Sequence, residues 1–314
     1  MKVSVCMITY RHSLYIGQAI EGVLSQETNH ELELIIADDA SPDDTESIVN
    51  QLIVNNTSKI DIKYYRHATN VGAMENLLFA IKKCTGDFIA MCEGDDYWMD
   101  ESKLEKQIDF LSNHPDYSLS YTHSLFLNNS TGSLTDHGPR YPDLNQEGNT
   151  KKLLSSKFVE FAASVFPAHT LKVIIESIKD ELKDAIIGDT RIFLEASVLG
   201  DFHFIEQPMS VYRVLEDSAS HSHKVDKFIR IKKDSLLCRK QFIQRNKLPR
   251  SWLQDYLKGH NTSIINRAFY VRNKKDSTEL MRETQINNFN DLFQLSSKVV
   301  IKYLLIKTRI HQLT

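Results

Sequence analysis

The chain has 314 residues, of which 41% are hydrophobic and 25% charged, a composition ordinary for a soluble globular protein with one or two domains. It contains no run of about 18 apolar residues, so no membrane-spanning helix is expected. The net charge of −3 combines an acidic part up to His223 (18 basic, 34 acidic residues) with a basic part from Lys224 onwards (20 basic, 7 acidic). The acidic part suits metal binding, and the basic part suits an anionic lipid, a phosphate or the acidic part itself.

Apolar runs alternate with segments of helical spacing in the first third of the chain. Runs without polar alternation predict strands that are buried on both faces. The predicted order is strand 3–9, helix 14–24, strand 31–37, a helix that begins at Ser41-Pro42, strand 60–65, helix 74–83 and strand 88–92. This alternation is the pattern of a doubly wound parallel sheet.

The rest of the chain is mixed and then helical. We expect a helix at 103–111, strands at 117–127 and 202–214, a polar loop at 128–150, helices at 170–178 and from 189 towards Gly200, and basic helices to the end. The four cysteines form no CxxC pair and are expected to be reduced, and the first residues have no signal-peptide pattern. Both features predict a cytoplasmic protein.

Polar side chains follow three of the predicted strands at the point where each strand ends. These side chains are Thr9-Tyr10, Asp38-Asp39 and the trio Glu93, Asp95 and Asp96. The carboxyl ends of parallel strands share one edge of a sheet, where open α/β sheets bind their ligands. Three acids within four positions repel one another unless a cation offsets their charge. The pattern therefore predicts a divalent-metal and diphosphate site.

An ordered set of short motifs carries a family resemblance. The motifs lie at 3–10, 15–16, 23–26, 38–45, 70–72, 86–89, 93–96 and 188–191. Together they resemble the family 2 glycosyltransferases of the GT-A fold, over roughly residues 1–215. The resemblance implies a GT-A catalytic domain over 1–218, with a doubly wound, mostly parallel, Rossmann-like sheet, and a basic, mainly helical region over 219–314.

The resemblance also implies a role for each matching residue of the donor site. Thr9 and Tyr10 would contact the nucleotide base, and Asp39 would accept a hydrogen bond from a uracil ring. Asp95 would lie at the ribose and the metal, and Asp96 would ligate the Mn²⁺ or Mg²⁺ that bridges the diphosphate. A hard cation on carboxylate oxygens offsets the charge that a nucleoside diphosphate develops as it leaves.

The catalytic base implied by the resemblance is Asp189, which would remove the proton of the acceptor hydroxyl and give in-line attack with inversion. Asp189 precedes a helical run, so a helix cap is the structural alternative. Asp38 and Asp39 also fit caps of the helix that follows them, and Asp38 is expected to be the structural member of that pair. Tyr97-Trp98 are expected to pack under the site, with contact to the sugar as the alternative.

Two positions depart from the family pattern. Arg11 stands where the family usually has Asn, so donor contacts there are expected to differ. Glu93 replaces the usual first Asp of the metal motif, so it follows Asp95 and Asp96 as a candidate ligand. His221 is a further candidate metal ligand, and His223 an additional phosphate or metal contact, with a surface position without a role as the alternative for each.

The sequence thus predicts a metal-dependent inverting glycosyltransferase that moves one sugar from a nucleotide sugar, with UDP as the expected nucleotide, to a hydroxyl acceptor. No nucleic-acid partner is expected. The basic tail suggests a lipid-diphosphate-linked acceptor in bacterial surface polysaccharide (O-antigen or capsule) assembly, and peripheral contact with the inner face of the plasma membrane through 294–310. Packing of that segment on protein is the alternative.

Other functions remain open to test. A nucleotidyl transferase would need a glycine-rich loop after the first strand, and Thr9-Tyr10-Arg11-His12 contains no glycine. An aspartyl-phosphate phosphatase would carry its acids after the first strand rather than a later one. The remaining alternative is a non-catalytic subunit that binds a nucleotide sugar or a glycan and partners an active transferase.

Overall fold

The structure is a computed structural model that describes residues 1–136, 146–156, 159–215, 224–271, 274–286, 291–292 and 294–311. The chain divides into two compact units. The first, which we call the sheet unit, comprises residues 1–153 and 157–216, and the second, the helical unit, comprises 154–156 and 217–314. Within the described ranges, no helix has the length and apolar character needed to cross a membrane.

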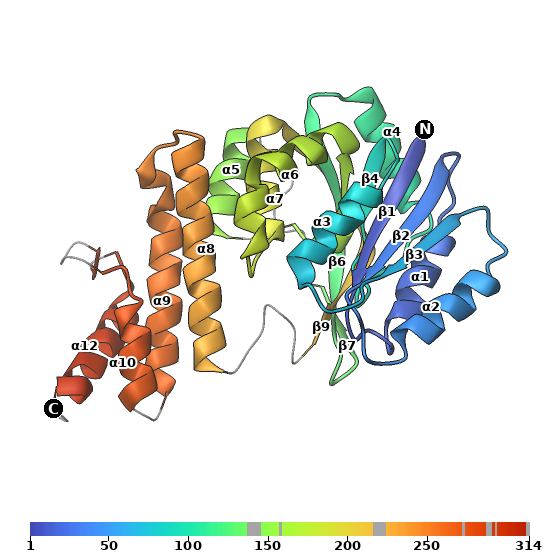
Figure 1. The fold of residues 1–314 in the computed structure, drawn as a ribbon. Coiled ribbons are helices and arrows are strands. Elements are labelled where there is room, and N and C mark those ends of the chain that lie inside the picture. The colour runs from blue at the N-terminus through green and yellow to red at the C-terminus, as the bar shows by residue number, and fades with distance from the viewer. Residues whose placement is uncertain are drawn as a thin grey trace. The chain divides into compact units, whose positions relative to one another are not determined.

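A nine-stranded sheet forms the centre of the sheet unit (Figure 1). Its main path runs β3-β2-β1-β4-β8-β6-β9-β5, and β7 pairs with β6. The strands are β1 (Lys2–Thr9), β2 (Glu31–Asp38), β3 (Asp61–Arg66), β4 (Phe88–Met91), β5 (Tyr97–Trp98), β6 (Tyr117–Asn128), β7 (Ser133–Thr135), β8 (Ser164–Pro167) and β9 (Asp201–Val214).

The first four strands are parallel, as the alternating sequence pattern predicts. The second half of the sheet is mixed, because β8 is antiparallel to both β4 and β6, β5 is antiparallel to β9, and β6 and β9 run parallel. The expected doubly wound sheet is therefore confirmed for its first half and extended by mixed strands in its second half.

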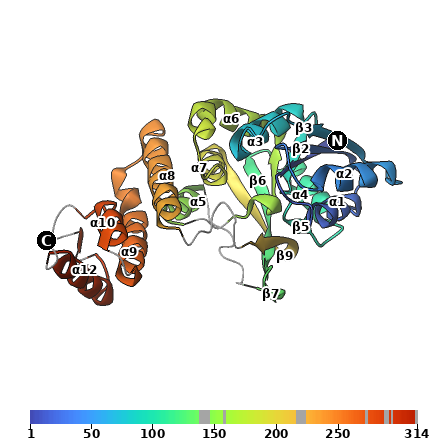
Figure 2. The ribbon, with the colours of Figure 1, turned by 60° about the horizontal axis from the view of Figure 1, so that its bottom comes forward.

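Helices cover both faces of the parallel half, as Figures 1 and 2 show. Val5 and Met7 of β1 pack in one buried cluster with Ile20, Val49 and Ile108, which belong to α1, α2 and α4. The third helix, α3, contacts β1 and β2. The helices of this unit are α1 (Ile16–Leu24), α2 (Thr45–Val54), α3 (Ala73–Lys83), α4 (Lys103–Asn113), α5 (Gln146–Ser155), η1 (Phe161–Ala163), α6 (Ala168–Lys183) and α7 (Asp189–Leu199).

The start of α2 differs from the sequence prediction. The pair Ser41-Pro42 predicted a helix start, but α2 begins at Thr45. The Asp43 carboxylate accepts hydrogen bonds from the backbone N–H of Thr45 at 3.3 Å and from its hydroxyl at 2.6 Å. This side chain satisfies a donor of the first helical turn, so the helix starts after Asp43 rather than at Pro42.

Close contact between α1 and β5 requires a glycine at position 22. A Cβ atom at Gly22 would lie 2.6 Å from the carbonyl oxygen of Trp98 and 3.1 Å from its backbone nitrogen. Trp98 is buried and its indole N–H donates to the carbonyl of Ala162 at 2.7 Å. The strand therefore has little freedom to move away from the helix.

Gly22→Ala is expected to lower the free energy of unfolding by about 1–3 kcal/mol, because the added methyl group overpacks this contact. Helix propensity alone would favour Ala by about 1 kcal/mol, so a fall in stability identifies the clash. Urea denaturation measures the change. Gly17→Ala in the same helix is the matched control, since the nearest atom to its Cβ would be Ile48 Cγ2 at 4.0 Å. Equal stability of the two variants would contradict the prediction.

The helical unit has a hydrophobic core of its own. Its elements are α8 (Val225–Arg245), η2 (Arg250–Leu253), α9 (Gln254–Tyr270), α10 (Lys274–Arg282) and α12 (Ser297–His311). Ile264 and Ile265 of α9, Leu280 of α10 and Ile306 of α12 are buried together. The expected helical character of this region is confirmed.

Candidate active site

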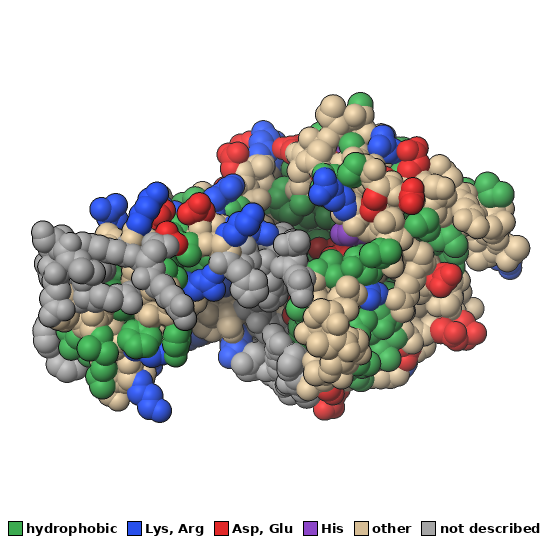
Figure 3. All heavy atoms as spheres, turned by 90° about the horizontal axis from the view of Figure 1, so that it is seen from below, with side chains coloured by type: hydrophobic (Ala, Val, Ile, Leu, Met, Phe, Trp, Pro, Cys, Tyr) green, Lys and Arg blue, Asp and Glu red, His purple; other side chains and the backbone are tan. Residues whose placement is uncertain are grey.

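The carboxyl ends of β1, β2 and β4 meet at one edge of the sheet. Thr9 is paired with Asp38 in the β1–β2 register. Beyond the strands, the N–H of Asp39 donates to the carbonyl of Thr9 at 3.0 Å, and the N–H of Gly94 donates to the carbonyl of Ile8 at 3.0 Å. The loops after β2 and β4 thus flank the end of β1 on its two sides. In the space-filling view of Figure 3, acidic side chains lie recessed in the surface of the sheet unit with a histidine beside them.

Asp95 and Asp96 occupy the loop that follows β4. Asp96 is 2% exposed, and one of its carboxylate oxygens accepts the backbone N–H of Arg213 at 2.7 Å. Burial, followed by the nearby charges of Asp95 and Glu93, raises the pKa of Asp96 well above its ordinary value. Asp95 is partly exposed, and its carboxylate lies 3.8 Å from Nε2 of His12. The site therefore concentrates negative charge that a cation would offset.

Two buried polar atoms face this loop without a protein partner. The hydroxyl of Thr9 and Nδ1 of His12 have no hydrogen-bond partner among the residues that the structure describes. A Cβ atom at Gly94 would lie 2.9 Å from the first and 3.0 Å from the second. Unsatisfied buried polar atoms are rare in native proteins. Together with the carboxylate oxygens of Asp95 and Asp96, they fit a hard divalent cation with an oxygen-rich ligand such as a diphosphate.

Asp39 holds the turn that precedes α3. It is 2% exposed, and its two carboxylate oxygens accept the backbone N–H groups of Val71 at 2.6 Å and Gly72 at 3.0 Å. Its carbonyl accepts the side-chain amide of Asn70 at 3.2 Å. A contact from Asp39 to a base would use a second lone pair of an oxygen that already accepts one hydrogen bond.

Asp38 is fully buried and makes structural hydrogen bonds. Its oxygens accept the backbone N–H of Ser41 at 2.8 Å and the hydroxyl of Tyr64 at 2.6 Å. The Ser41 hydroxyl in turn accepts the N–H of Arg11 at 3.0 Å, which joins the loops after β1 and β2.

Arg11 has a φ of 60°, and its guanidinium lies 5.3 Å from the ring centre of Tyr10. Tyr10 itself is 37% exposed.

Asp189 is the first residue of α7 and follows Gly188. Its carboxylate accepts the N–H of Thr190 at 2.6 Å, so it satisfies a donor at the start of its own helix. A Cβ atom at Gly188 would meet the sulfur of Met74, which lies in the first turn of α3. The start of α7 therefore packs against the start of α3, whose preceding turn is held by Asp39.

The remaining candidate ligands are less closely described. Glu93 is half-buried, its carbonyl accepts the N–H of Asp96 at 3.1 Å, and its charge contributes to the raised pKa of Asp96. His221 and His223 lie outside the described residues. A metal contact from any of these three stays a prediction.

Arg213 is a site residue to which the sequence assigned no role. It is the penultimate residue of β9 and is 7% exposed. Its Nε donates a hydrogen bond to the carbonyl of Asp95 at 2.8 Å, and a terminal nitrogen donates to the side-chain oxygen of Gln18 in α1 at 2.8 Å. Its guanidinium also lies 4.7 Å from the ring centre of Tyr15. With its backbone N–H on Asp96, this one residue fixes the acidic loop against both β9 and α1.

Another cluster of candidate metal ligands in the sheet unit lies away from this edge of the sheet. Within the described ranges, ligand atoms of His30, Glu105 and Asp109 lie within 4.8 Å of one another, but His30 precedes β2. The Glu105 carboxylate there accepts hydrogen bonds from Thr28 and Asn29, so it already holds a loop.

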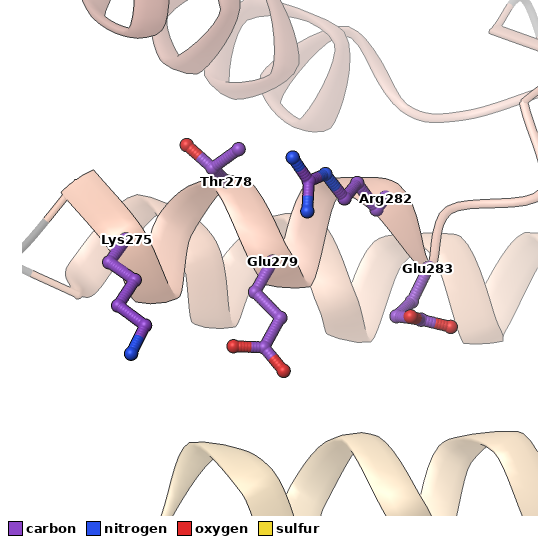
Figure 4. A pocket seen from close by; sticks show the side chains of 5 residues that line it. All are labelled: Lys275, Thr278, Glu279, Arg282 and Glu283. Carbon is purple, nitrogen blue, oxygen red and sulfur yellow. The ribbon is translucent and has the colours of Figure 1, made fainter.

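A cavity of about 530 Å³ lies in the helical unit along α10 (Figure 4). Its lining is of mixed sign and consists of Lys275, Thr278, Glu279, Arg282 and Glu283. Lys233 of α8 forms an ion pair with Glu283 at 2.9 Å. Cations and anions offset one another here, so the cavity does not reproduce the acidic site at the sheet edge.

Comparison with known proteins gives the same family as the motifs. A model described as "Glycosyl transferase family 2" matches residues 4–164, just over half of the chain. An uncharacterized protein of Mycobacterium tuberculosis is 27% identical over 226 residues, which cover 71% of this chain and 62% of that protein. The chain thus spans less than two thirds of the length of that curated relative.

Two solved structures share the fold. S. aureus TarS in complex with UDP matches with a TM-score of 0.60 and 16% identity, covering 99% of this chain and 88% of the other. The mannosyltransferase PcManGT from Pyrobaculum calidifontis, in complex with GDP-Man and Mn²⁺, matches with a TM-score of 0.57 and 13% identity, covering 98% and 86%. These likenesses confirm the expected GT-A architecture. By its motifs, its fold and the family model that matches it, the chain belongs to glycosyl transferase family 2.

Proposed function

We propose that this chain is a metal-dependent, inverting glycosyltransferase that moves one sugar from a nucleotide sugar, with UDP as the nucleotide, to a hydroxyl acceptor. The observation that carries the proposal is the crowding of the buried Asp96 by Asp95, beside the unsatisfied polar atoms of Thr9 and His12, in a chain of this family. The UDP in TarS and the Mn²⁺ in PcManGT support the choice of nucleotide and of metal class.

The donor is proposed to lie along the carboxyl edge of the sheet. Thr9, Tyr10 and Asp39 would contact the base, and Asp95 would contact the ribose. Asp96, together with Asp95, would hold a Mn²⁺ or Mg²⁺ ion. The ion would offset the charge of the diphosphate when bound. Arg213 keeps the two carboxylates in place through its hydrogen bonds to the loop.

The reaction requires one proton acceptor on the acceptor side. Asp189 would take the proton of the acceptor hydroxyl while the oxygen forms its bond to the anomeric carbon. The bond between that carbon and the diphosphate oxygen breaks, and the nucleoside diphosphate leaves with the bonding electrons. Attack opposite the leaving group inverts the anomeric configuration.

The acceptor is proposed to be a lipid-diphosphate-linked saccharide of bacterial surface polysaccharide assembly, at the inner face of the plasma membrane. The support is the net positive charge of the chain from Lys224 onwards, which contains 20 basic and 7 acidic residues. Such a segment is attracted to anionic headgroups and to phosphates.

A panel of nucleotide sugars, with released nucleoside diphosphate as the readout, tests this function. We expect UDP release from one UDP-sugar in the presence of Mn²⁺, loss of release in excess EDTA, and recovery when Mn²⁺ is restored. Isothermal titration with UDP is run in parallel. Tight UDP binding without transfer or hydrolysis of any donor would instead establish the binding-subunit alternative. Release that persists in EDTA would remove the metal from the proposal.

A further inference from the structure

The last described helix, α12, has a buried face and an exposed face that are both apolar. Val299 and Ile306 are 6% and 1% exposed and belong to the core of the helical unit. Lys302 lies beside this core, where its ammonium donates to Asn266 of α9 at 2.8 Å. These contacts fix the rotation of α12 about its axis, so its opposite face is defined.

The opposite face carries three large aliphatic side chains in contact with solvent. Ile301, Leu304 and Leu305 are 56%, 52% and 53% exposed. Their spacing of three and four residues places them on one strip of the helix. We call these three residues the apolar strip. A monomer gains nothing from exposing such a strip, since each side chain would be more stable out of water.

Exposed cations lie before and after the apolar strip, and an exposed aromatic ring lies beside Lys302 of the same helix. Lys298 and Lys307, both exposed, lie at the two ends of its span. The Lys302 ammonium lies 4.9 Å from the ring centre of Tyr270, which is 71% exposed. Long cationic side chains and tyrosine rings are the groups that occupy the headgroup region when a helix lies on a membrane.

The charge of α12 decides between two occupants of the strip. Its sequence contains Lys298, Lys302, Lys307 and Arg309 and no acidic residue. A second copy of this chain would bring the same positive charge to the interface, where like charges repel. An anionic bilayer brings the opposite charge and an apolar layer beneath it.

We propose that α12 lies flat on an anionic membrane, with the apolar strip inserted below the headgroups and Lys298 and Lys307 on lipid phosphates. Vesicle binding requires no turnover, so this surface can be tested separately from the reaction. It also deepens the proposed function, since it would hold the chain at the surface where a lipid-linked acceptor lies.

Sedimentation of the full chain with vesicles tests the proposal. We expect the wild type to bind phosphatidylcholine vesicles that contain phosphatidylglycerol and to bind vesicles of pure phosphatidylcholine less. The binding to phosphatidylglycerol should weaken as salt is added. Ile301→Ser/Leu304→Ser/Leu305→Ser should lower the partition coefficient by about tenfold or more, since it removes the inserted apolar surface. Lys298→Gln/Lys307→Gln should remove the preference for phosphatidylglycerol.

The matched control is Val54→Ser/Val173→Ser/Leu199→Ser, which removes three aliphatic side chains that are 83%, 58% and 51% exposed in the sheet unit. It should bind vesicles like the wild type. Circular dichroism and thermal melting confirm that each variant is folded. Unchanged binding of the strip variant, or absence of wild-type binding, would overturn the proposal. Concentration-dependent dimers that disappear in the strip variant, without vesicle binding, would assign the strip to a second copy. The panel of nucleotide sugars is unaffected by either outcome.

Discussion

Asp189→Asn is expected to lower kcat for sugar transfer by about 10²–10⁴-fold, the usual contribution of a positioned general base. The asparagine keeps the size of the side chain and an oxygen that accepts the Thr190 N–H, so the start of α7 is preserved. It removes the negative charge and the capacity to take a proton at neutral pH. Transfer should therefore fall while binding of UDP stays unchanged.

Kinetics and binding together separate the base from the helix cap. If Asp189 only caps α7, Asp189→Asn should change both stability and transfer little, because asparagine and aspartate satisfy the start of a helix about equally well. Asp184→Asn is the matched control, because this exposed carboxylate follows α6 directly and lies five positions before Asp189. Transfer by Asp189→Asn at the rate of the control would assign Asp189 to the cap and leave the base to be found elsewhere.

The parallel half of the sheet could be predicted because its sequence signal is local. β4 is buried on both faces and is apolar throughout, and β1 and β2 carry such a run in their second halves, at 5–8 and 34–37. The acids that follow these strands then converge by topology alone. The predicted start of α2 was wrong because two local signals compete there. Pro42 favours a start at 41–42, but the carboxylate of Asp43 accepts the N–H of Thr45, and the helix begins at Thr45.

The second half of the sheet and the role of Arg213 depend on contacts between distant parts of the chain. β5 has two residues and pairs with β9 more than a hundred positions later, with Tyr97 opposite Val211. No local periodicity specifies such a pairing. It is this pairing that brings the backbone of Arg213 to Asp96. A lone arginine near the end of the last strand was the only signal in the sequence.

The sequence pattern also did not predict that Lys103, behind the acidic loop, is buried. Lys103 lies in the first turn of α4, is fully buried, and donates to Oε1 of Gln107 at 2.7 Å. Its ammonium lies 4.3 Å from the centre of the Trp98 ring. Burial lowers the pKa of Lys103 from 10.5 to about 7. Charge at this position therefore costs stability in the native state.

The sign of this effect follows from the two pKa values. The unfolded lysine holds its proton up to a pH near its ordinary pKa of about 10.4, and the native lysine only below about 7. Between these values the unfolded state binds more protons, so the free energy of unfolding rises with pH. The cost is fully present below pH 7 and is lost above the ordinary pKa. At about 1.4 kcal/mol per pKa unit, the full cost is of the order of 5 kcal/mol.

Lys103→Met is therefore expected to stabilise the protein by about 1–3 kcal/mol at pH 7 and to destabilise it at pH 10. The methionine removes the buried charge but leaves Oε1 of Gln107 without its donor, which costs about 1–3 kcal/mol at either pH. Urea denaturation at both pH values measures the difference from wild type, so that other groups titrating in this range cancel. Lys106→Met, on the exposed face of the same helix, is the control and should show no such crossing. A difference between Lys103→Met and wild type that is equal at pH 7 and pH 10 would mean that native Lys103 keeps its proton over this range, so that burial does not lower its pKa.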